Sequence, residues 1–156
     1  MDFFAALRGL AARCAAHARG FLAPRRLGVR GLILDSEGWV LLVRHTYVSG
    51  WYLPGGGVEA GESAVGALRR ELYEEGGVEL LGAPRLHGLF FNPKASRRDY
   101  VACYVVRDFR VTPTQPNFEI AEARFFPVNA VPEDTSPATR ARLAEVLTGT
   151  SVPDVW

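Results

Sequence analysis

The sequence predicts an α/β sandwich, and three observations support this fold class. Short segments rich in β-branched and aromatic residues lie on both sides of an amphipathic, acid-rich segment. A second helical segment with clear capping signals lies near the end of the chain. We find no internal repeat, low-complexity tract or interdomain linker. Strands that alternate with two helices therefore indicate a single layered domain, which we assign to residues 24–156.

The bulk properties of the chain agree with one compact domain. Its 156 residues are enough to bury one hydrophobic core. The net charge of +1 provides no general field that would attract nucleic acid, so we expect no nucleic-acid partner. Cys14 and Cys103 are too few and too isolated for a disulfide framework or a thiolate metal site. We therefore expect a protein of the reducing cytoplasm.

Residues 1–23 are interpreted as a separate N-terminal segment. Apolar residues recur every three or four positions from Phe3 to Phe21, with arginines elsewhere, which predicts a basic amphipathic helix. Arg8 and Arg13 interrupt the apolar run of a signal peptide, and no stretch reaches the roughly 18 residues of a membrane span. Three placements stay open: packing on the domain or on a second subunit of a homodimer, lying on a membrane surface, or partial disorder. We favour packing and do not expect a membrane partner.

Five segments of the domain are predicted to be strands. They cover residues 28–34, 39–44, 86–91, 100–107 and 123–126. Residues 35–38, Asp-Ser-Glu-Gly, are a hairpin turn signal between the first two strands. Residues 92–99 form a polar loop between the third and the fourth strand. The sequence therefore predicts a strand-rich domain with one helix between the second and third strands.

The last helix is predicted from its capping residues. Ser136 is suited to the N-cap position, and Pro137 follows at the first helical position. Gly149 lies just past the expected end of the helix near Leu147. These signals fix a helix that follows the last strand.

The acid-rich segment crowds carboxylates onto one face of a helix. At about 100° per residue, Glu71, Glu74 and Glu75 fall within an arc of roughly 100°. Leu68 and Leu72 belong to a separate apolar stripe, so the same helix also has a face for the core. Like charges at this spacing repel, whereas hard divalent cations need such a cluster of oxygen ligands. The alternative interpretation is an ordinary solvated acidic face.

Two further features favour a functional interpretation of this helix. Three glycines, residues 55–57, precede it and allow the backbone to approach a ligand without obstruction by side chains. Arg70 lies next to Glu71 and one turn before Glu74. We expect its planar guanidinium to orient a carboxylate, and we include Arg70 among the catalytic residues on that ground.

Residues 56–78 resemble the signature motif of the Nudix hydrolases. That motif is Gly, five residues, Glu, seven residues, Arg-Glu, an aliphatic residue, any residue, Glu-Glu, any residue, Gly and an aliphatic residue. Every fixed position is met, by Gly56, Glu62, Arg70, Glu71, Leu72, Glu74, Glu75, Gly77 and Val78. The resemblance implies a mixed β-sheet between helices, that is, an α/β/α sandwich.

The resemblance also implies that the acids hold Mg²⁺ or Mn²⁺. A diphosphate linkage resists attack because its oxygens are already negative, so a catalyst has to neutralise charge and activate water. We assign Glu74 and Glu75 as the principal metal ligands. Further ligands, direct or through water, are Glu71, Glu62 and the carbonyl of Gly55 or Gly56.

The general base stays open at this stage. In some family members the glutamate of the Arg-Glu pair removes the proton from water, which here implies Glu71. In others an acid on a loop outside the motif does so, and Glu119 and Glu122 are the candidates. Both also fit the description of ordinary surface acids near a strand. We give Glu119 slightly more weight because it precedes the predicted strand.

Five residues are candidates for substrate binding, with simpler roles open for each. Tyr47 and Trp51 could stack on a base, although aromatic residues beside a strand often belong to the core. Arg44, Arg97 and Arg98 could contact phosphates, although exposed basic residues are often only solvated.

The expected activity is metal-dependent hydrolysis of a nucleoside diphosphate linked to another group X, releasing a nucleoside monophosphate. The partner is then a small-molecule nucleotide: a nucleotide sugar, a dinucleotide or a nucleoside triphosphate. The alternative is a catalytically idle nucleotide-binding or regulatory module on the same fold.

Overall fold

The computed structural model describes residues 26–113, 118–150 and 153–156. The predicted amphipathic helix of residues 1–23 lies outside these described residues. Within them, the elements in chain order are β1 (Arg26–Ile33), β2 (Trp39–His45), α2 (Ala64–Gly76), β3 (Val78–Leu80), β4 (Arg85–Phe91), β5 (Asp99–Val106), β6 (Phe109–Val111), β7 (Ile120–Pro127) and α3 (Pro137–Thr148). Among the described residues, no helix is both long enough and apolar enough to cross a membrane.

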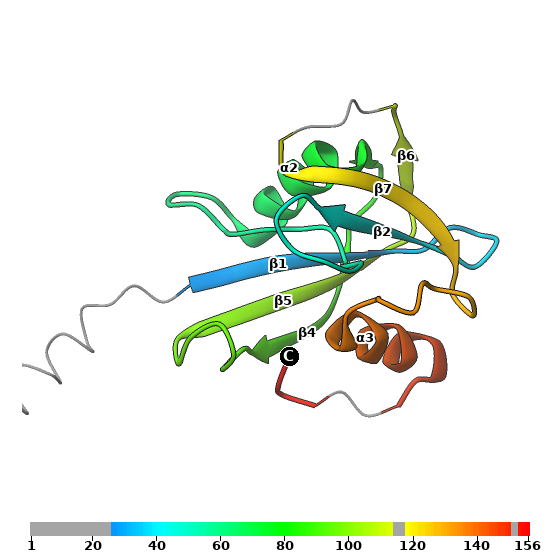
Figure 1. The fold of residues 1–156 in the computed structure, drawn as a ribbon. Helices are drawn as coiled ribbons and strands as arrows, with labels where there is room; N and C mark the ends of the chain where they lie inside the picture. The colour runs from blue at the N-terminus through cyan, green and yellow to red at the C-terminus, as the bar shows by residue number, and fades with distance from the viewer. Residues whose placement is uncertain (1–25, 114–117, 151–152) are drawn as a thin grey trace, which may run out of the picture.

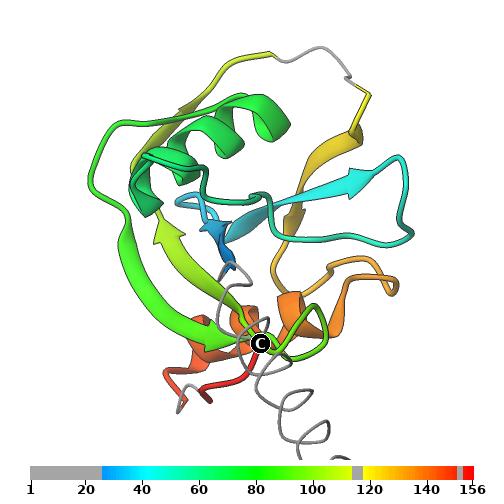
Figure 2. The ribbon, with the colours of Figure 1, turned by 90° about the vertical axis from the view of Figure 1, so that its left-hand side faces the viewer.

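The predicted α/β/α sandwich is confirmed. Strands β1, β5 and β4 form a mixed sheet, in which β1 pairs parallel with β5 and β4 pairs antiparallel with it. Strands β2 and β7 form an antiparallel pair, as do β3 and β6. Helices α2 and α3 lie on opposite sides of these strands (Figures 1 and 2). The layers therefore present one helix to each face of the strand assembly.

The predicted hairpin between the first two strands is confined to its turn. Asp35 caps the turn, because its carboxylate accepts hydrogen bonds from the backbone N–H groups of Glu37 and Trp39. A single bridge between Leu34 and Val40 follows, and the two strands then diverge into different sheets. The reason is that β1 pairs over its whole length with β5 and β2 with β7. The local turn signal was correct, but the strand pairing it suggested is wrong.

The hydrophobic core is divided into two clusters by the central strands. One cluster packs α2 against the strands and includes Leu68, Leu72, Val29 and Ile33. The other joins the strands to α3 and includes Leu32, Phe90 and Leu143 among others. Along β1 the side chains alternate between these clusters, as the two-residue period of a strand requires. Both helices are thus fixed on one shared framework.

The helix ends agree with the sequence. Ser63 caps α2 by accepting a hydrogen bond from the Gly66 N–H, and Gly77 ends it in the left-handed conformation. Ser136 and Gly149 play the same roles for α3, as predicted. The two three-residue strands β3 and β6 were not predicted from the sequence. Their pairing ties the end of α2 to the segment after β5.

Candidate active site

The candidate site is built on α2, whose buried face fixes the direction of its acids. Leu68 and Leu72 are fully buried against the strands, and a Cβ on Gly31 of β1 would lie only 2.8 Å from the Leu72 side chain. This close contact between helix and strand leaves little freedom to α2. On the adjoining face, the Glu75 side chain is 7% exposed and that of Glu74 is 56% exposed. The acids of one helix therefore occupy different environments.

Arg70 holds three of the motif acids. Its guanidinium forms a bidentate contact with Glu62, with N–O distances of 3.1 and 3.0 Å. It also donates to Glu71 at 2.8 Å and lies 3.5 Å from Glu74. The hydrogen bond from Arg70 lowers the pKa of Glu62, so this acid is kept ionised. Because Arg70 also donates to the Gly57 carbonyl, it connects the acids to the glycines before the helix.

Glu75 is the buried member of the set. Its Oε2 accepts a hydrogen bond of 2.7 Å from the Gly55 N–H. Burial raises the pKa of Glu75 to about 7, and the neighbouring charges of Glu71 and Glu119 act in the same direction. Burial and negative neighbours both disfavour the ionised carboxylate. A cation beside it would reverse this effect.

The glycines at 55–57, which we call the glycine segment, lie between β1 and α2. Residue 55 has to be glycine here, because its φ is +137° and a Cβ at this position would lie 2.1 Å from the Val29 carbonyl oxygen, whereas a Cβ at residue 56 would displace the Glu71 carboxylate. The Gly56 carbonyl accepts a hydrogen bond of 2.8 Å from Val29 of β1. Arg30, also on β1, donates to the carbonyls of Leu53 and Gly55. The backbone of the glycine segment therefore runs directly beside Glu71 and Glu75 of α2.

The oxygen donors fit a hard divalent cation in kind. Glu71 and Glu75, with the adjacent backbone carbonyls, are ligands of the type that Mg²⁺ and Mn²⁺ prefer. In the part of the chain that the structure describes, no group of three or more His, Cys, Asp or Glu side chains is already gathered for a metal. The contacts of Arg70 give the reason, because Glu62, Glu71 and Glu74 turn toward its guanidinium.

The two candidate bases outside the motif are placed differently. Glu122 lies within β7 opposite Arg44 of β2, and the two side chains form an ion pair of 2.9 Å. Glu119 lies just before β7, and its carbonyl accepts a hydrogen bond from Thr46. The charge of Glu119 contributes to the raised pKa of Glu75, after the larger effect of burial. Glu122 is therefore paired with Arg44, whereas the charge of Glu119 acts on Glu75.

The substrate-binding candidates separate in the same way. Trp51 is buried, and its ring packs edge-on against Phe126 at 4.8 Å between centroids. Tyr47 is 72% exposed, and burial together with the charge of Glu119 raises its pKa. Trp51 thus belongs to the core, whereas Tyr47 faces solvent close to the acids. Arg97 and Arg98 lie in the β4–β5 loop beside Arg26, apart from Tyr47 and Arg44.

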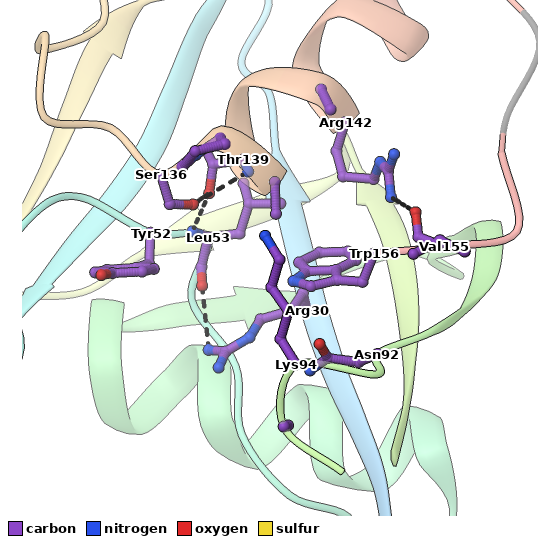
Figure 3. Close-up of a pocket in the computed structure, with 14 residues that line it drawn as sticks. Arg30, Tyr52, Leu53, Asn92, Lys94, Ser136, Thr139, Arg142, Val155 and Trp156 are labelled. Carbon is purple, nitrogen blue, oxygen red and sulfur yellow. Dashed lines mark hydrogen bonds between the residues drawn. The ribbon is translucent and has the colours of Figure 1, made fainter. Parts of the chain in front are cut away.

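A pocket of about 570 Å³, which was not predicted from the sequence, lies between β1, the β4–β5 loop, α3 and the C-terminal residues. Figure 3 shows its polar side chains, among them Arg30, Asn92 and Lys94, around the ring of Trp156. Arg30 could have been recognised as a pocket residue from the sequence, because it is a charged residue inside an otherwise apolar strand. Nothing in the sequence indicated that Trp156 lines the pocket. It is held there because its backbone N–H donates to the Phe91 carbonyl of β4.

The C-terminal residues are held by a buried charge network on α3. Arg142 is 1% exposed and contacts Glu145 at 2.5 Å, and Glu145 in turn contacts His87 at 2.8 Å. The Arg142 guanidinium lies over the Phe90 ring at 3.9 Å, and it donates to the Val155 carbonyl. This network fixes one wall of the pocket of Figure 3.

The chain is similar to known proteins in sequence and in fold. The family model of the NUDIX domain matches residues 24–147. Diphosphoinositol polyphosphate phosphohydrolase 2 of Rattus norvegicus is 45% identical over 76 residues, which cover 47% of this chain and 41% of that protein. RNA pyrophosphohydrolase of Bartonella bacilliformis is 41% identical over 64 residues, 35% of this chain and 38% of that protein. The chain therefore matches only about two fifths of the length of these relatives.

Solved structures show the same fold. The MutT NUDIX hydrolase from Burkholderia pseudomallei superposes with a TM-score of 0.67 and 24% sequence identity, covering 78% of this chain and 97% of that one.

Proposed function

The chain belongs to the NUDIX family, and we propose that it hydrolyses the diphosphate linkage of a nucleoside diphosphate joined to another group X, releasing a nucleoside monophosphate with the help of Mg²⁺ or Mn²⁺. The observation that carries this proposal is the position of the buried Glu75 and of Glu71 directly beside the glycine segment. A phosphate chain laid along that segment meets backbone instead of side chains.

Glu71 and Glu75 would hold the cation, with a backbone carbonyl of the glycine segment as a further oxygen donor. When bound, the cation neutralises phosphate oxygens and makes water more acidic. Both carboxylate oxygens of Glu62 accept hydrogen bonds from Arg70. Glu62 could therefore bind a cation only by giving up part of this ion pair. We therefore assign Arg70 and Glu62 to the support of the site, and Glu74 to a solvent-facing ligand position.

Two carboxylates remain as candidates for the base that accepts the proton of water. Glu71 lies on α2 inside the motif, and Glu119 lies before β7 close enough for its charge to act on Glu75. We favour Glu119, because Glu71 is already engaged by Arg70. Glu122 is a weaker candidate since it pairs with Arg44.

The relatives bear on the class of substrate. The names of two of them describe hydrolysis of a diphosphoinositol polyphosphate and of an RNA pyrophosphate linkage. Both substrates contain a phosphoanhydride attached to a group that is itself anionic. This supports the anhydride chemistry proposed here, and it leaves the identity of X open among several classes.

A metal-dependent turnover screen tests the proposal. We expect release of a nucleoside monophosphate from at least one member of a panel of nucleotide sugars, dinucleotides and nucleoside triphosphates, with Mg²⁺ or Mn²⁺ and not with EDTA. Glu79→Gln is a matched control, because Glu79 lies after α2 and, within the described residues, forms an ion pair only with Arg110. Binding of nucleotides with no turnover of any substrate would support the alternative of an idle binding module.

A further inference from the structure

A second hollow, of about 680 Å³, lies beside the start of β1 and is strongly basic. Its lining residues are Arg26, Leu27, Leu89, Arg97, Arg98 and Tyr100. We call this hollow the arginine pocket. It contains three guanidinium groups and no carboxylate, in a chain whose net charge is only +1. Such a local concentration of one charge is not a consequence of composition.

Strand pairing brings the three arginines together. Arg26 begins β1 and lies in register with Asp99, which begins β5. The Arg26 N–H donates to the Arg98 carbonyl at 3.1 Å, so the end of the β4–β5 loop is joined to β1. Asn92 closes the loop through its own N–H and its side-chain amide, which both donate to Asp99. The backbone that carries the arginines is therefore fixed from both sides.

Two arginines of this pocket, Arg26 and Arg97, differ in their partners from other surface arginines. Arg44 and Arg110 each contact a glutamate across a strand pair. Within the described ranges, Arg26 and Arg97 form no ion pair. The nearest acid in sequence, Asp99, is engaged by Asn92. Adjacent like charges repel, so an anion bound here would relieve that repulsion as well as form new contacts.

The arginine pocket is continuous with the candidate active site. A smaller hollow of about 310 Å³ shares Arg26 and Leu27 with it, and also contains Gly56 and Arg30. Gly56 touches Glu71 of α2, and Arg30 lines the pocket of Figure 3 as well. A ligand that lies over the glycine segment therefore enters a hollow that also contains Arg26 and Trp156.

We propose that the arginine pocket binds a phosphate group carried by X, so that the substrate of this enzyme is a phosphoanhydride whose second half is itself phosphorylated. This inference rests on the proposed function, because it assigns the far end of the same substrate. Guanidinium groups suit this role, since each presents paired N–H donors that match two phosphate oxygens. Leu89 and Tyr100, both exposed, add an apolar wall next to the charges.

Binding can be tested without catalysis. We would titrate the full chain, in EDTA, with inorganic tripolyphosphate and measure the heat of binding at low and moderate salt. The Arg97→Gln/Arg98→Gln double variant should bind at least about tenfold more weakly than the wild type, with a smaller dependence on salt. Arg110→Gln removes one arginine from β6, outside all three hollows, and should bind as the wild type does. Circular dichroism establishes that each variant is folded.

Turnover then tests the assignment to X. The substrates are an adenosine tetraphosphate, in which X is anionic, and an ADP-sugar, in which X is neutral. In the double variant the ratio of kcat/KM for the tetraphosphate to that for the ADP-sugar should fall about tenfold, whereas Arg110→Gln should leave the ratio unchanged.

The outcomes separate this proposal from the proposed function. Absence of metal-dependent turnover in the wild type, together with arginine-dependent binding of tripolyphosphate, contradicts the hydrolase activity and supports the anion site. Equal tripolyphosphate affinity in the wild type and the double variant overturns the anion site, even where hydrolysis is observed. Arginine-dependent binding of anionic vesicles or single-stranded RNA, with tripolyphosphate affinity unchanged, also overturns it in favour of a macromolecular partner.

Discussion

Helices α2 and α3 each carry an arginine that contacts glutamates, but the two networks have opposite surroundings. On α3, Arg142 and Glu145 are almost fully buried, and His87 occupies the second oxygen of Glu145. On α2, the Arg70 side chain is 28% exposed and that of its partner Glu74 is 56% exposed. The network on α3 is almost fully buried behind one wall of the pocket of Figure 3, whereas that on α2 is open toward solvent.

The comparison shows how the surroundings of a network indicate its purpose. A buried network whose charged groups pair with one another fixes structure, here the C-terminal residues against β4, even though the Nε of Arg142 has no hydrogen-bond partner among the described residues. An open network of several acids around one guanidinium leaves excess negative charge available to a ligand. Substitutions in the two networks should therefore affect different measurements, stability for α3 and turnover for α2.

The largest effect is expected for Glu75. Glu75→Gln keeps the shape of the side chain but removes a charge from the proposed metal site, so turnover should fall on the order of a hundred- to a thousandfold. The measurement is kcat with saturating Mg²⁺ or Mn²⁺ on the best substrate of the screen. Glu79→Gln should retain wild-type turnover, and an equal loss in both variants would contradict the assignment of Glu75.

Substitution of the two arginines should separate the networks directly. Arg142→Met leaves Glu145 buried with only His87 as a partner, and we expect a loss of about 3 kcal/mol in the free energy of unfolding. Arg70→Met removes a partly exposed network and should lower the free energy of unfolding by about 1 kcal/mol or less. Urea denaturation in EDTA measures both.

Activity should show the reverse order for these variants. Arg70→Met should lower turnover because Glu62 and Glu71 lose their common partner. Arg142→Met, assayed at a temperature where it is folded, should keep most of its turnover. A large stability loss in Arg70→Met would show that the α2 network is structural as well.

The stability of the metal-free protein should depend on pH through Glu75. Burial raises the pKa of this carboxyl to about 7 from an unfolded value near 4.5, so the folded state binds the proton more tightly. The free energy of unfolding should therefore decrease as the pH rises from about 4.5 to about 7. This loss of stability is absent below that pH window and complete above it, at about 3 kcal/mol.

Glu75→Gln provides the test of this linkage. Without the ionisable group, the variant should be more stable than the wild type at pH 8 and of similar stability at pH 4.5, both in EDTA. Thermal unfolding across this range measures the difference, and Glu79→Gln is again the control. A variant that is less stable than the wild type at pH 8 would contradict the burial argument.

Local signals in the sequence predicted local structure well. Ser136 and Gly149 fixed the ends of α3 because capping depends on residues within one turn of the helix end. The short strands β3 and β6 were missed because three residues are too few for a period to be recognised. The pairing of β1 with β2 was wrongly expected because the turn between them is a local signal, whereas the pairing itself is decided by the distant strands β5 and β7.

The candidate site shows the same difference between local signals, which the sequence contains, and contacts between distant segments, which it does not. The order of the acids along α2 could be read from the motif, because it depends on spacing within one helix. The exposure of each acid could not, since it depends on how the glycine segment and β1 cover them. The burial of Trp51 and the approach of Arg97 and Arg98 to Arg26 likewise depend on contacts far apart in the sequence.

The smallest effect is expected for Glu122→Gln, and comparison with Glu119→Gln should distinguish the two acids outside the motif. Glu122 and Arg44 are both about half-exposed, so Glu122→Gln should change the stability by about 0.5 kcal/mol and leave turnover within about twofold of the wild type. Glu119→Gln should lower kcat about tenfold or more, because its charge acts on Glu75 and on the phenol of Tyr47. The acid limb of the pH–kcat profile should also shift in Glu119→Gln and stay in place in Glu122→Gln. If both variants retain wild-type kcat and profile, the base lies inside the motif, and Glu71, held by Arg70 on α2, is the group that accepts the proton.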